Sequence, residues 1–219
     1  MSEALQVHGI VLSSMPIGES DKRIVLLTRE LGKISAFARG ARRPGSALMA
    51  GTGAFAFGRF SLIEGRSSHS LVQTAVDNYF YELAEDPLSA CYGYYFLDFA
   101  EYYGREGIEA AEMLNLLYLS LKALLHRNLD DRLVRRVYEL RLMAINGEYA
   151  PHISALSEGA MYTVQYIVRS PLEKLYTFAV SPEILAELEK MLDGHMDRIL
   201  DRPLRSRDVL EALLSVPTG

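Results

Sequence analysis

The first 80 residues alternate between hydrophobic and polar positions with a period of two, which is typical of strands with one buried face. Glycines and polar clusters separate the alternating segments, and most of the gaps hold no helical pattern. Five short strands in about 75 residues favour a small Greek-key barrel of the OB type. The predicted strands are residues 5–14, 22–30, 33–39, 55–65 and 68–78, with a helical turn expected around Ala47–Ala50.

After residue 86 the hydrophobic positions recur with the period of a helix. Pro87 stands where a helix can begin, Gly147 where one can end, and Ser181 has the side chain of an N-cap. Residues 148–180 follow neither period, so we expect irregular structure there. The predicted helices are residues 87–103, 108–126, 130–146, 181–194 and 206–214.

Charge divides the chain in the same way as the hydrophobic period. The 219 residues have a net charge of −5, yet residues 1–80 carry nine Lys or Arg against six Asp or Glu. Residues 81–219 carry 14 basic residues against 22 acidic ones. We therefore expect an α+β protein, with an N-terminal five-stranded OB-type β-barrel at 1–80 and an all-α helical domain at 81–219. Such asymmetry indicates that one of the two modules faces a polyanion.

The turn between the second and third predicted strands decides which side chains share a face. Gly32 fits the left-handed last position of a three-residue loop over residues 30–32. A two-residue turn would instead reverse the direction of every side chain. The three-residue loop predicts the pairs Arg29–Lys33, Leu27–Ser35, Val25–Phe37 and Arg23–Arg39, with Ile24, Leu26, Ile34, Ala36 and Ala38 inside the barrel.

The outer face of this hairpin is then expected to carry cations around one aromatic ring, Phe37. Guanidinium and ammonium groups hold phosphates, while a base stacks on the ring. OB barrels bind oligonucleotides on this strand pair and the adjacent loops. The pattern predicts a platform for single-stranded nucleic acid, and its alternative is an ordinary solvated strand face. The predicted cations are Arg23, Arg29, Lys33 and Arg39, with Arg42 and Arg43 in the following loop.

A motif that contains the second and third predicted strands carries a family resemblance. Residues 16–46 contain the patterns P-x-G-E-x, T-x-x-x-G-K and A-x-G-A-R-R, and they resemble the N-terminal domain of the RecO family. The order of a barrel followed by a helical domain also resembles that family. The helical half is similar only in outline, through "INGEYAPHI" and "VSPEI".

The resemblance implies a non-enzymatic recombination mediator in DNA repair. Such a protein binds single-stranded and double-stranded DNA, anneals complementary strands, and helps to load recombinase together with RecR and single-strand binding protein. The helical domain of the family contributes DNA contacts and receives the acidic C-terminal tail of single-strand binding protein. We weigh two alternatives, a protein-interaction scaffold with little DNA affinity and an OB-fold RNA-binding protein of translation.

Many relatives in the resembled family hold a structural zinc with two cysteine pairs after the third helix. Residues 148–180 contain no cysteine here, and a tetrahedral site needs four ligands. We therefore expect no zinc, no other metal and no cofactor. "GTGAFAFG" at 51–58 lacks the helix that a dinucleotide loop needs, and no pattern of a catalytic site appears. The sequence predicts that the protein is not an enzyme.

The run "RLVRRVYELR" at 132–141 admits two interpretations. Arg135 is expected to pair with Asp131 and Glu139 on an exposed helix face, which is an ordinary structural role. The remaining arginines are candidate contacts for DNA or an acidic partner. They are Arg132, Arg136 and Arg141.

Location is predicted from three further features. No run approaches 18 apolar residues, so no transmembrane helix and no membrane partner are expected. The N-terminus lacks the basic region of a signal peptide. A lone Cys91 excludes an internal disulfide and fits a reducing cytoplasm, where the protein would lie at the nucleoid.

Overall fold

The structure is a computed structural model that describes residues 4–65, 68–148 and 156–215. The chain forms two compact units, and each unit is made of two stretches of sequence. The first contains the described residues of Met1–Tyr81 together with Leu97–Leu114, and the second contains Glu82–Phe96 and the described residues from Asn115 onward. No helix within the described ranges is long and apolar enough to cross a membrane.

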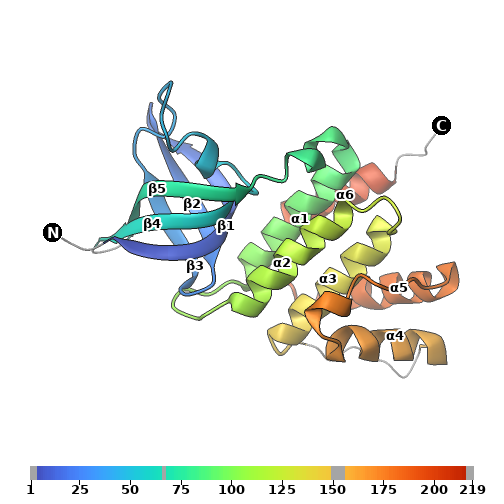
Figure 1. Cartoon of the computed structure of the whole chain (residues 1–219). Helices are drawn as coiled ribbons and strands as arrows, with labels where there is room; N and C mark the ends of the chain where they lie inside the picture. The colour runs from blue at the N-terminus through green and yellow to red at the C-terminus, as the bar shows by residue number, and fades with distance from the viewer. Residues whose placement is uncertain (1–3, 66–67, 149–155, 216–219) are drawn as a thin grey trace. The chain divides into compact units, whose positions relative to one another are not determined.

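Five strands of the first unit close into a barrel in the order β1-β2-β3-β5-β4, and Figure 1 shows them wrapping around one another. All neighbours pair antiparallel except β3 and β5, which pair parallel. The prediction of an OB-type barrel is therefore confirmed. The strands are β1 (Leu5–Ile17), β2 (Asp21–Thr28), β3 (Gly32–Ala38), β4 (Phe57–Glu64) and β5 (His69–Asn78).

The barrel is filled by the inward half of each alternating strand. Burial along β3 alternates residue by residue, with Ile34, Ala36 and Ala38 buried and the side chains between them half-buried. The small alanines leave room for larger side chains from facing strands, including Phe60 and Leu62 of β4. The alternate residues point to the outer side of the barrel, which carries polar and charged side chains together with exposed apolar ones such as Met15 and Val72, so the core fixes where they point.

The hairpin of β2 and β3 has a different register from the predicted one. Its pairs are Arg23 with Phe37, Val25 with Ser35, Leu27 with Lys33 and Thr28 with Gly32. The predicted pairs Arg29–Lys33, Leu27–Ser35, Val25–Phe37 and Arg23–Arg39 are therefore wrong by two residues. Two residues is one full repeat of the side-chain period, so every side chain keeps the predicted face.

The physical reason for the shift lies in the turn itself. Thr28 and Gly32 close the loop, because the Thr28 hydroxyl donates to the Gly32 carbonyl and accepts from the Leu31 N–H. Gly32 has the predicted left-handed conformation, with φ of 67°. It lies at the first residue of β3, one position beyond the loop, so residues 29–31 form the turn.

The tip of this hairpin is covered by residues 104–110 of the same unit. The Lys33 N–H donates to the carbonyl of Arg105 at 2.9 Å, and the Gly107 N–H donates to the carbonyl of Leu31 at 3.0 Å. A Cβ on Gly32 would overlap the carbonyl oxygens of Arg105 and Ile108. Glycine is therefore required at position 32 both for its backbone angle and for this close approach.

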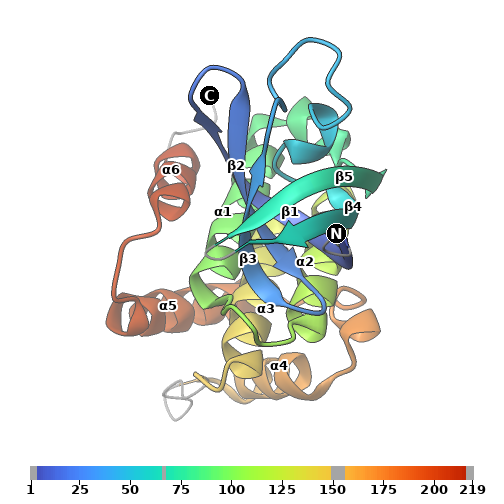
Figure 2. The ribbon, with the colours of Figure 1, turned by 90° about the vertical axis from the view of Figure 1, so that its left-hand side faces the viewer.

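The connection between β3 and β4 projects from the same end of the barrel as the β1–β2 turn, as Figures 1 and 2 both show. Its helical turn, η1, lies at Ala50–Thr52, slightly later than the predicted Ala47–Ala50. Thr52 is buried, and its hydroxyl donates to the carbonyl of Leu48. This hydrogen bond closes the helical turn at the end of the connection.

The predicted helices are present, and residues 158–169 add a helix that was not predicted. The interpretation of 148–180 as irregular is therefore wrong for α4, whereas residues 149–155 lie outside the described ranges. Ser157 caps α4 by accepting from the Ala160 N–H. The helices are α1 (Pro87–Tyr103), α2 (Ala111–Leu124), α3 (Asp131–Ile145), α4 (Glu158–Arg169), α5 (Pro182–Ile199) and α6 (Arg205–Leu214).

Candidate nucleic-acid interface

The centre of the site is a row of three outward side chains on adjacent strands. Met15 of β1 lies opposite Arg23 of β2, and Arg23 lies opposite Phe37 of β3. Met15 is 63% exposed, Arg23 is exposed and Phe37 is half-buried. The Arg23 guanidinium donates to the Ser35 hydroxyl at 3.0 Å, which holds it along the β3 side of the row. An apolar chain, a cation and an aromatic ring thus lie side by side.

One carboxylate, that of Asp21, organises the loops beside this row. It accepts the Gly40 N–H at 2.8 Å and the Ser20 hydroxyl at 3.1 Å. The Gly40 N–H lowers the pKa of Asp21 most, and the charges of Arg43 and Arg39 lower it further. Asp21 therefore stays ionised and ties the end of β3 to the β1–β2 turn.

Arg42 and Arg43 follow this tie and remain exposed. The backbone N–H of Arg42 donates to the Ser20 carbonyl at 2.9 Å, and its guanidinium donates to the Gly18 carbonyl at 3.0 Å. No salt bridge joins Arg39, Arg42 or Arg43 to an acid within the described part of the chain. Their charges are therefore open to a polyanion.

Lys22 is a further cation at this end of the barrel. Its ammonium group donates to the Thr52 hydroxyl at 3.1 Å, so it fastens the β3–β4 connection to β2. Burial lowers the pKa of Lys22, and the nearby charge of Arg42 lowers it further. The group adds positive potential while serving as a structural tie.

Two of the seven predicted residues lie at the other end of the hairpin. Arg29 is six residues from Arg23 along the strand, which is roughly 20 Å. The Lys33 ammonium donates to the carbonyl of Glu101 at 2.7 Å, and the carbonyl of Arg29 accepts from Ala110 at 3.0 Å. The structure thus brings together five predicted residues, namely Arg23, Phe37, Arg39, Arg42 and Arg43, and separates Arg29 and Lys33 from them.

The candidate arginines of α3 are engaged within the second unit. Arg132 forms two hydrogen bonds to Glu189, at 2.9 and 3.0 Å. Arg136 is 4% exposed and forms a bidentate pair with Asp193. The Arg141 guanidinium donates to the carbonyl of Val168. Arg132 and Arg136 are thus paired with carboxylates, unlike Arg39, Arg42 and Arg43 of the barrel, and Arg141 is bound to a backbone carbonyl.

The ion pair between Arg135 and Glu139 forms as predicted, but its predicted exposure is wrong. Both side chains are buried, and the pair measures 2.7 Å. No ion pair joins Arg135 to Asp131 in the described residues. Burial alone raises the pKa of Glu139, but the charges of Arg136 and Arg135 outweigh it and lower that pKa. A carboxylate between two guanidiniums thus lies buried in the helical unit.

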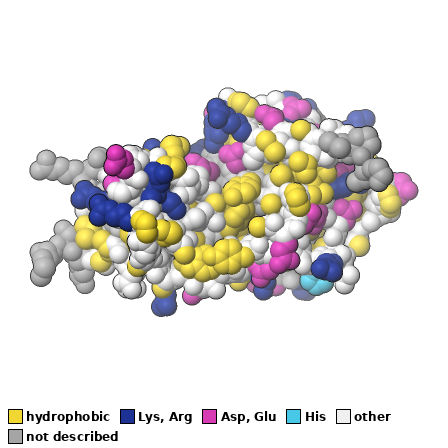
Figure 3. Space-filling view, turned by 90° about the horizontal axis from the view of Figure 1, so that it is seen from above, with side chains coloured by type: hydrophobic (Ala, Val, Ile, Leu, Met, Phe, Trp, Pro, Cys, Tyr) yellow, Lys and Arg dark blue, Asp and Glu magenta, His cyan; other side chains and the backbone are white. Residues whose placement is uncertain are grey.

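The surface of the barrel agrees with this division. Figure 3 shows Lys and Arg side chains gathered over the barrel, with hydrophobic side chains beside them. Cations of this kind hold phosphates, and exposed apolar or aromatic groups receive unpaired bases. The geometry suits a single strand that lies along the row and turns past the loops.

Met15 and Lys22 belong to this site but were not predicted. Lys22 lies next to Arg23 in the sequence, so the charge run itself was the available signal. Met15 had no signal, because only the pairing of β1 with β2 places it beside Arg23. No group of three or more His, Cys, Asp or Glu side chains that could hold a metal occurs in 4–65, 68–148 or 156–215.

Comparisons with known proteins place these observations in a family context. Residues 1–79 match the family model for the recombination protein O N terminal region, and residues 147–208 match that for its C terminal region. The DNA repair protein RecO of Acetivibrio thermocellus is 29% identical over 95% of this chain and 97% of that protein. The protein of the same name from Alkaliphilus metalliredigens is 35% identical over 69% of this chain and 61% of that protein. The one from Symbiobacterium thermophilum is 27% identical over 95% of this chain and 97% of that protein.

Proposed function

Since this chain belongs to the RecO family, we propose that it acts in recombinational DNA repair as a DNA-binding mediator without catalytic activity. The observation that carries the proposal is a group of exposed cations, Arg39, Arg42 and Arg43, that form no salt bridge among the described residues and lie beside the row of Met15, Arg23 and Phe37. Phosphates bind the cations, and bases stack on the ring of Phe37, which lies at the end of the row. The row lies on the strand pair that OB barrels use for oligonucleotides.

The finer activity follows from the shallow character of this surface. Single-stranded DNA lies on the row with its bases unpaired, and double-stranded DNA binds through its phosphates alone. Neutralised phosphates and exposed bases are what two complementary strands need in order to anneal. The proposed partners of the mediator are DNA, RecR and the acidic tail of single-strand binding protein, and its proposed place is the nucleoid.

The helical unit of this relative is proposed to fold without the zinc that many family members hold. Residues 148–180 contain no cysteine to supply thiolate ligands. The apolar side of α4, with Ala160, Val164 and Ile167 buried, packs that region instead. The fold of the helical unit then rests on packing, with no cofactor required.

The test is a change of both loop arginines to alanine in the full chain. We expect Arg42→Ala with Arg43→Ala to weaken binding of a labelled single strand about equally for all sequences. The slope of log affinity against log salt should fall by about one to two phosphate equivalents. Fluorescence anisotropy titrations at several salt concentrations measure both quantities.

A charge-matched control separates local contact from total charge. Arg127→Ala with Arg169→Ala removes two exposed arginines from the helical unit and should leave the slope unchanged. If both double variants have the same effect, total charge explains binding and the interface is wrong. If the loop variant binds like the wild type, the scaffold alternative is favoured.

A further inference from the structure

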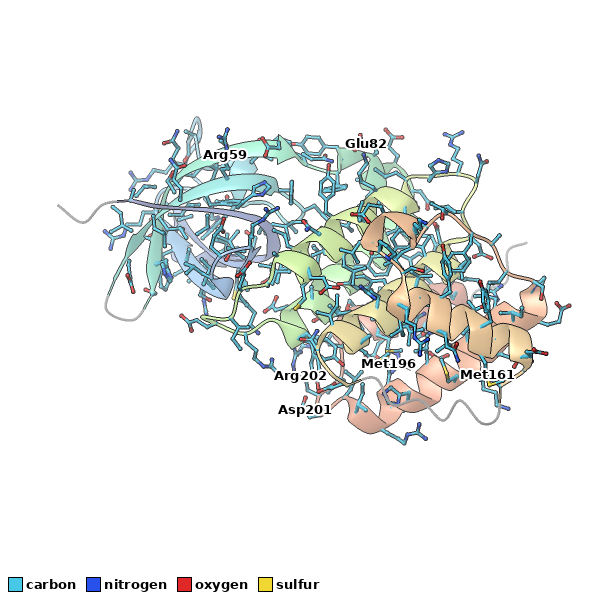
Figure 4. All side chains as sticks on the ribbon, turned by 60° about the horizontal axis from the view of Figure 1, so that its bottom comes forward. Arg59, Glu82, Met161, Met196, Asp201 and Arg202 are labelled. Atoms are coloured by element: carbon cyan, nitrogen blue, oxygen red, sulfur yellow. The ribbon has the colours of Figure 1, made fainter. Side chains whose placement is uncertain are left out.

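A second polar surface of the barrel lies on the outer side of β1, β4 and β5. Gln6, Arg59, Ser61, Gln73 and Ala75 line a hollow of 200 Å³ there. None of these residues belongs to the row of Met15, Arg23 and Phe37. Figure 4 shows Arg59 on the barrel, with its side chain directed away from the strands.

The register of three strands explains the shape of the hollow. Gln6 lies opposite Ser61, and Ser61 lies opposite Gln73, so these three form one cross-strand row. Arg59 lies opposite Ala75 in the next outward row. The two small residues form the floor and the three long ones form the rim, because neighbouring Cβ atoms lie only about 4.5–5.5 Å apart.

The rim side chains have no partner in the described part of the chain. Neither Arg59 nor the two glutamines form a side-chain hydrogen bond or a salt bridge there. The nearest acid along β5 is Asp77, which faces His8 at 3.6 Å. The guanidinium and both carboxamides are therefore available to a ligand from outside.

The chemistry of these groups selects the class of ligand. A guanidinium binds phosphate through parallel N–H donors. Each carboxamide offers donors and an acceptor together, which matches the edge of a nucleobase. An acidic peptide would need several cations, and this hollow has one. A nucleotide unit of a single strand therefore fits better than an acidic peptide.

We propose that this hollow binds a second nucleic-acid strand, so that the barrel carries two strand sites. The inference rests on the proposed function and extends it. Gln6 and Met15 are nine residues apart on β1, which is about 30 Å along the strand. Two sites separated in this way hold two strands on one barrel, and annealing requires both strands to be held with their bases unpaired.

The experiment uses the full chain and two equilibria. A labelled oligonucleotide of about six nucleotides, within the range of OB site sizes, is titrated to resolve a first and a second bound strand. We expect Arg59→Ala with Gln73→Ala to weaken the second equilibrium about fivefold or more while changing the first less than about twofold. Annealing of two complementary oligonucleotides should slow in parallel. A second strand carrying 4-thiothymidine should photocrosslink to β4 or β5.

Matched controls exclude a general effect of the substitutions. Arg127→Ala with Gln165→Ala removes the same residue types from the helical unit and should change neither equilibrium. Arg42→Ala with Arg43→Ala should weaken the first equilibrium. Thermal melting of each variant checks that the protein is folded, and no loss of stability is expected because all six substituted positions are exposed.

Several results would overturn the two-site proposal. A wild-type protein that binds one strand only would leave the proposed function intact and remove the second site. Equal weakening of both equilibria by the Arg59 and Gln73 variant would show one continuous path around the barrel. An unchanged second equilibrium, with crosslinks elsewhere, would show that the hollow does not contact the strand. A wild type that binds no single strand would overturn the proposed function and this inference together.

Discussion

The barrel and α3 each contain a short run rich in arginine, and the two runs have opposite fates. "ARGARRP" leaves Arg39, Arg42 and Arg43 at the surface, with no salt bridge to an acid among the described residues. "RLVRRVYELR" places Arg135 and Arg136 in the interior, around the fully buried Glu139. One run projects its charge into solvent, whereas the other is neutralised by acids of the protein itself.

The difference comes from segments far away in the sequence. The acids that neutralise α3 are Asp193 of α5 and Glu211 of α6, 57 and 76 residues from their arginine partners. The barrel run meets a single organising acid, Asp21, which lies in contact with the backbone of Gly40. A run of arginines therefore indicates a binding surface only where the fold does not neutralise the guanidiniums in salt bridges.

The largest effect on stability is expected when the buried carboxylate of Glu139 is removed. Glu139→Gln keeps the shape of the side chain but leaves two buried guanidiniums without their shared counter-charge. We expect the free energy of unfolding to fall by about 3–5 kcal/mol, as for other broken buried pairs. Urea denaturation of the full chain measures the change.

Glu211→Gln is the matched control, because its partner is also Arg135 but its own side chain is 47% exposed. Its cost should stay below about 1 kcal/mol. The lowered pKa of Glu139 gives a second readout. Its ionised form stabilises the fold above the ordinary pKa of 4.5. The difference in free energy of unfolding between wild type and Glu139→Gln should therefore decrease as pH falls below that value. A difference in free energy of unfolding that increases in acid would contradict this electrostatic role.

An intermediate effect is expected from the ring of the barrel site. Phe37→Ala should weaken binding of a single strand by roughly 1–3 kcal/mol, because one stacked base is lost. The ring is half-buried, so the free energy of unfolding should change by only about 1 kcal/mol. Thermal melting and anisotropy titration of one variant measure both. A loss of about 3–5 kcal/mol of stability would instead indicate a core ring.

The smallest effect is expected at the exposed edge of the α3 network. Arg132→Ala removes a surface pair with Glu189 and should cost less than about 1 kcal/mol of stability. Single-strand affinity should stay within the error of the titration. Reduced affinity would restore Arg132 as a nucleic-acid contact and weaken the contrast between the two runs.

The barrel was largely predictable because each strand carries its own evidence in the alternation of burial. The outward direction of Phe37 followed from that alternation. It was predicted correctly even though the predicted register was wrong by two residues. The register depended on one hydrogen-bonded turn between Thr28 and Gly32, which no period encodes. Local patterns thus determined faces, and a single side-chain contact determined pairs.

The site was predictable only in part for the same reason. Arg42 and Arg43 stand out in any reading of the sequence, whereas Met15 joins them only through strand pairing. The pairing of Arg136 with Asp193 depends on helix packing. The hydrogen bond from Lys33 to the carbonyl of Glu101 depends on a segment 68 residues further along the chain. α4 was missed because Gly159 and its β-branched residues weaken the helical signal of the sequence alone.

The return of residues 97–114 to the barrel has a consequence for inheritance. The chain leaves the first unit at Glu82, comes back at Leu97 and leaves again after Leu114, so the barrel is interleaved with its neighbour. A gene fragment for residues 1–80 would leave the carbonyls of Arg29 and Leu31 without their donors. A single crossover between genes therefore transfers this unit intact only if it falls after codon 114, and residues 82–96 of the other unit are then transferred with it.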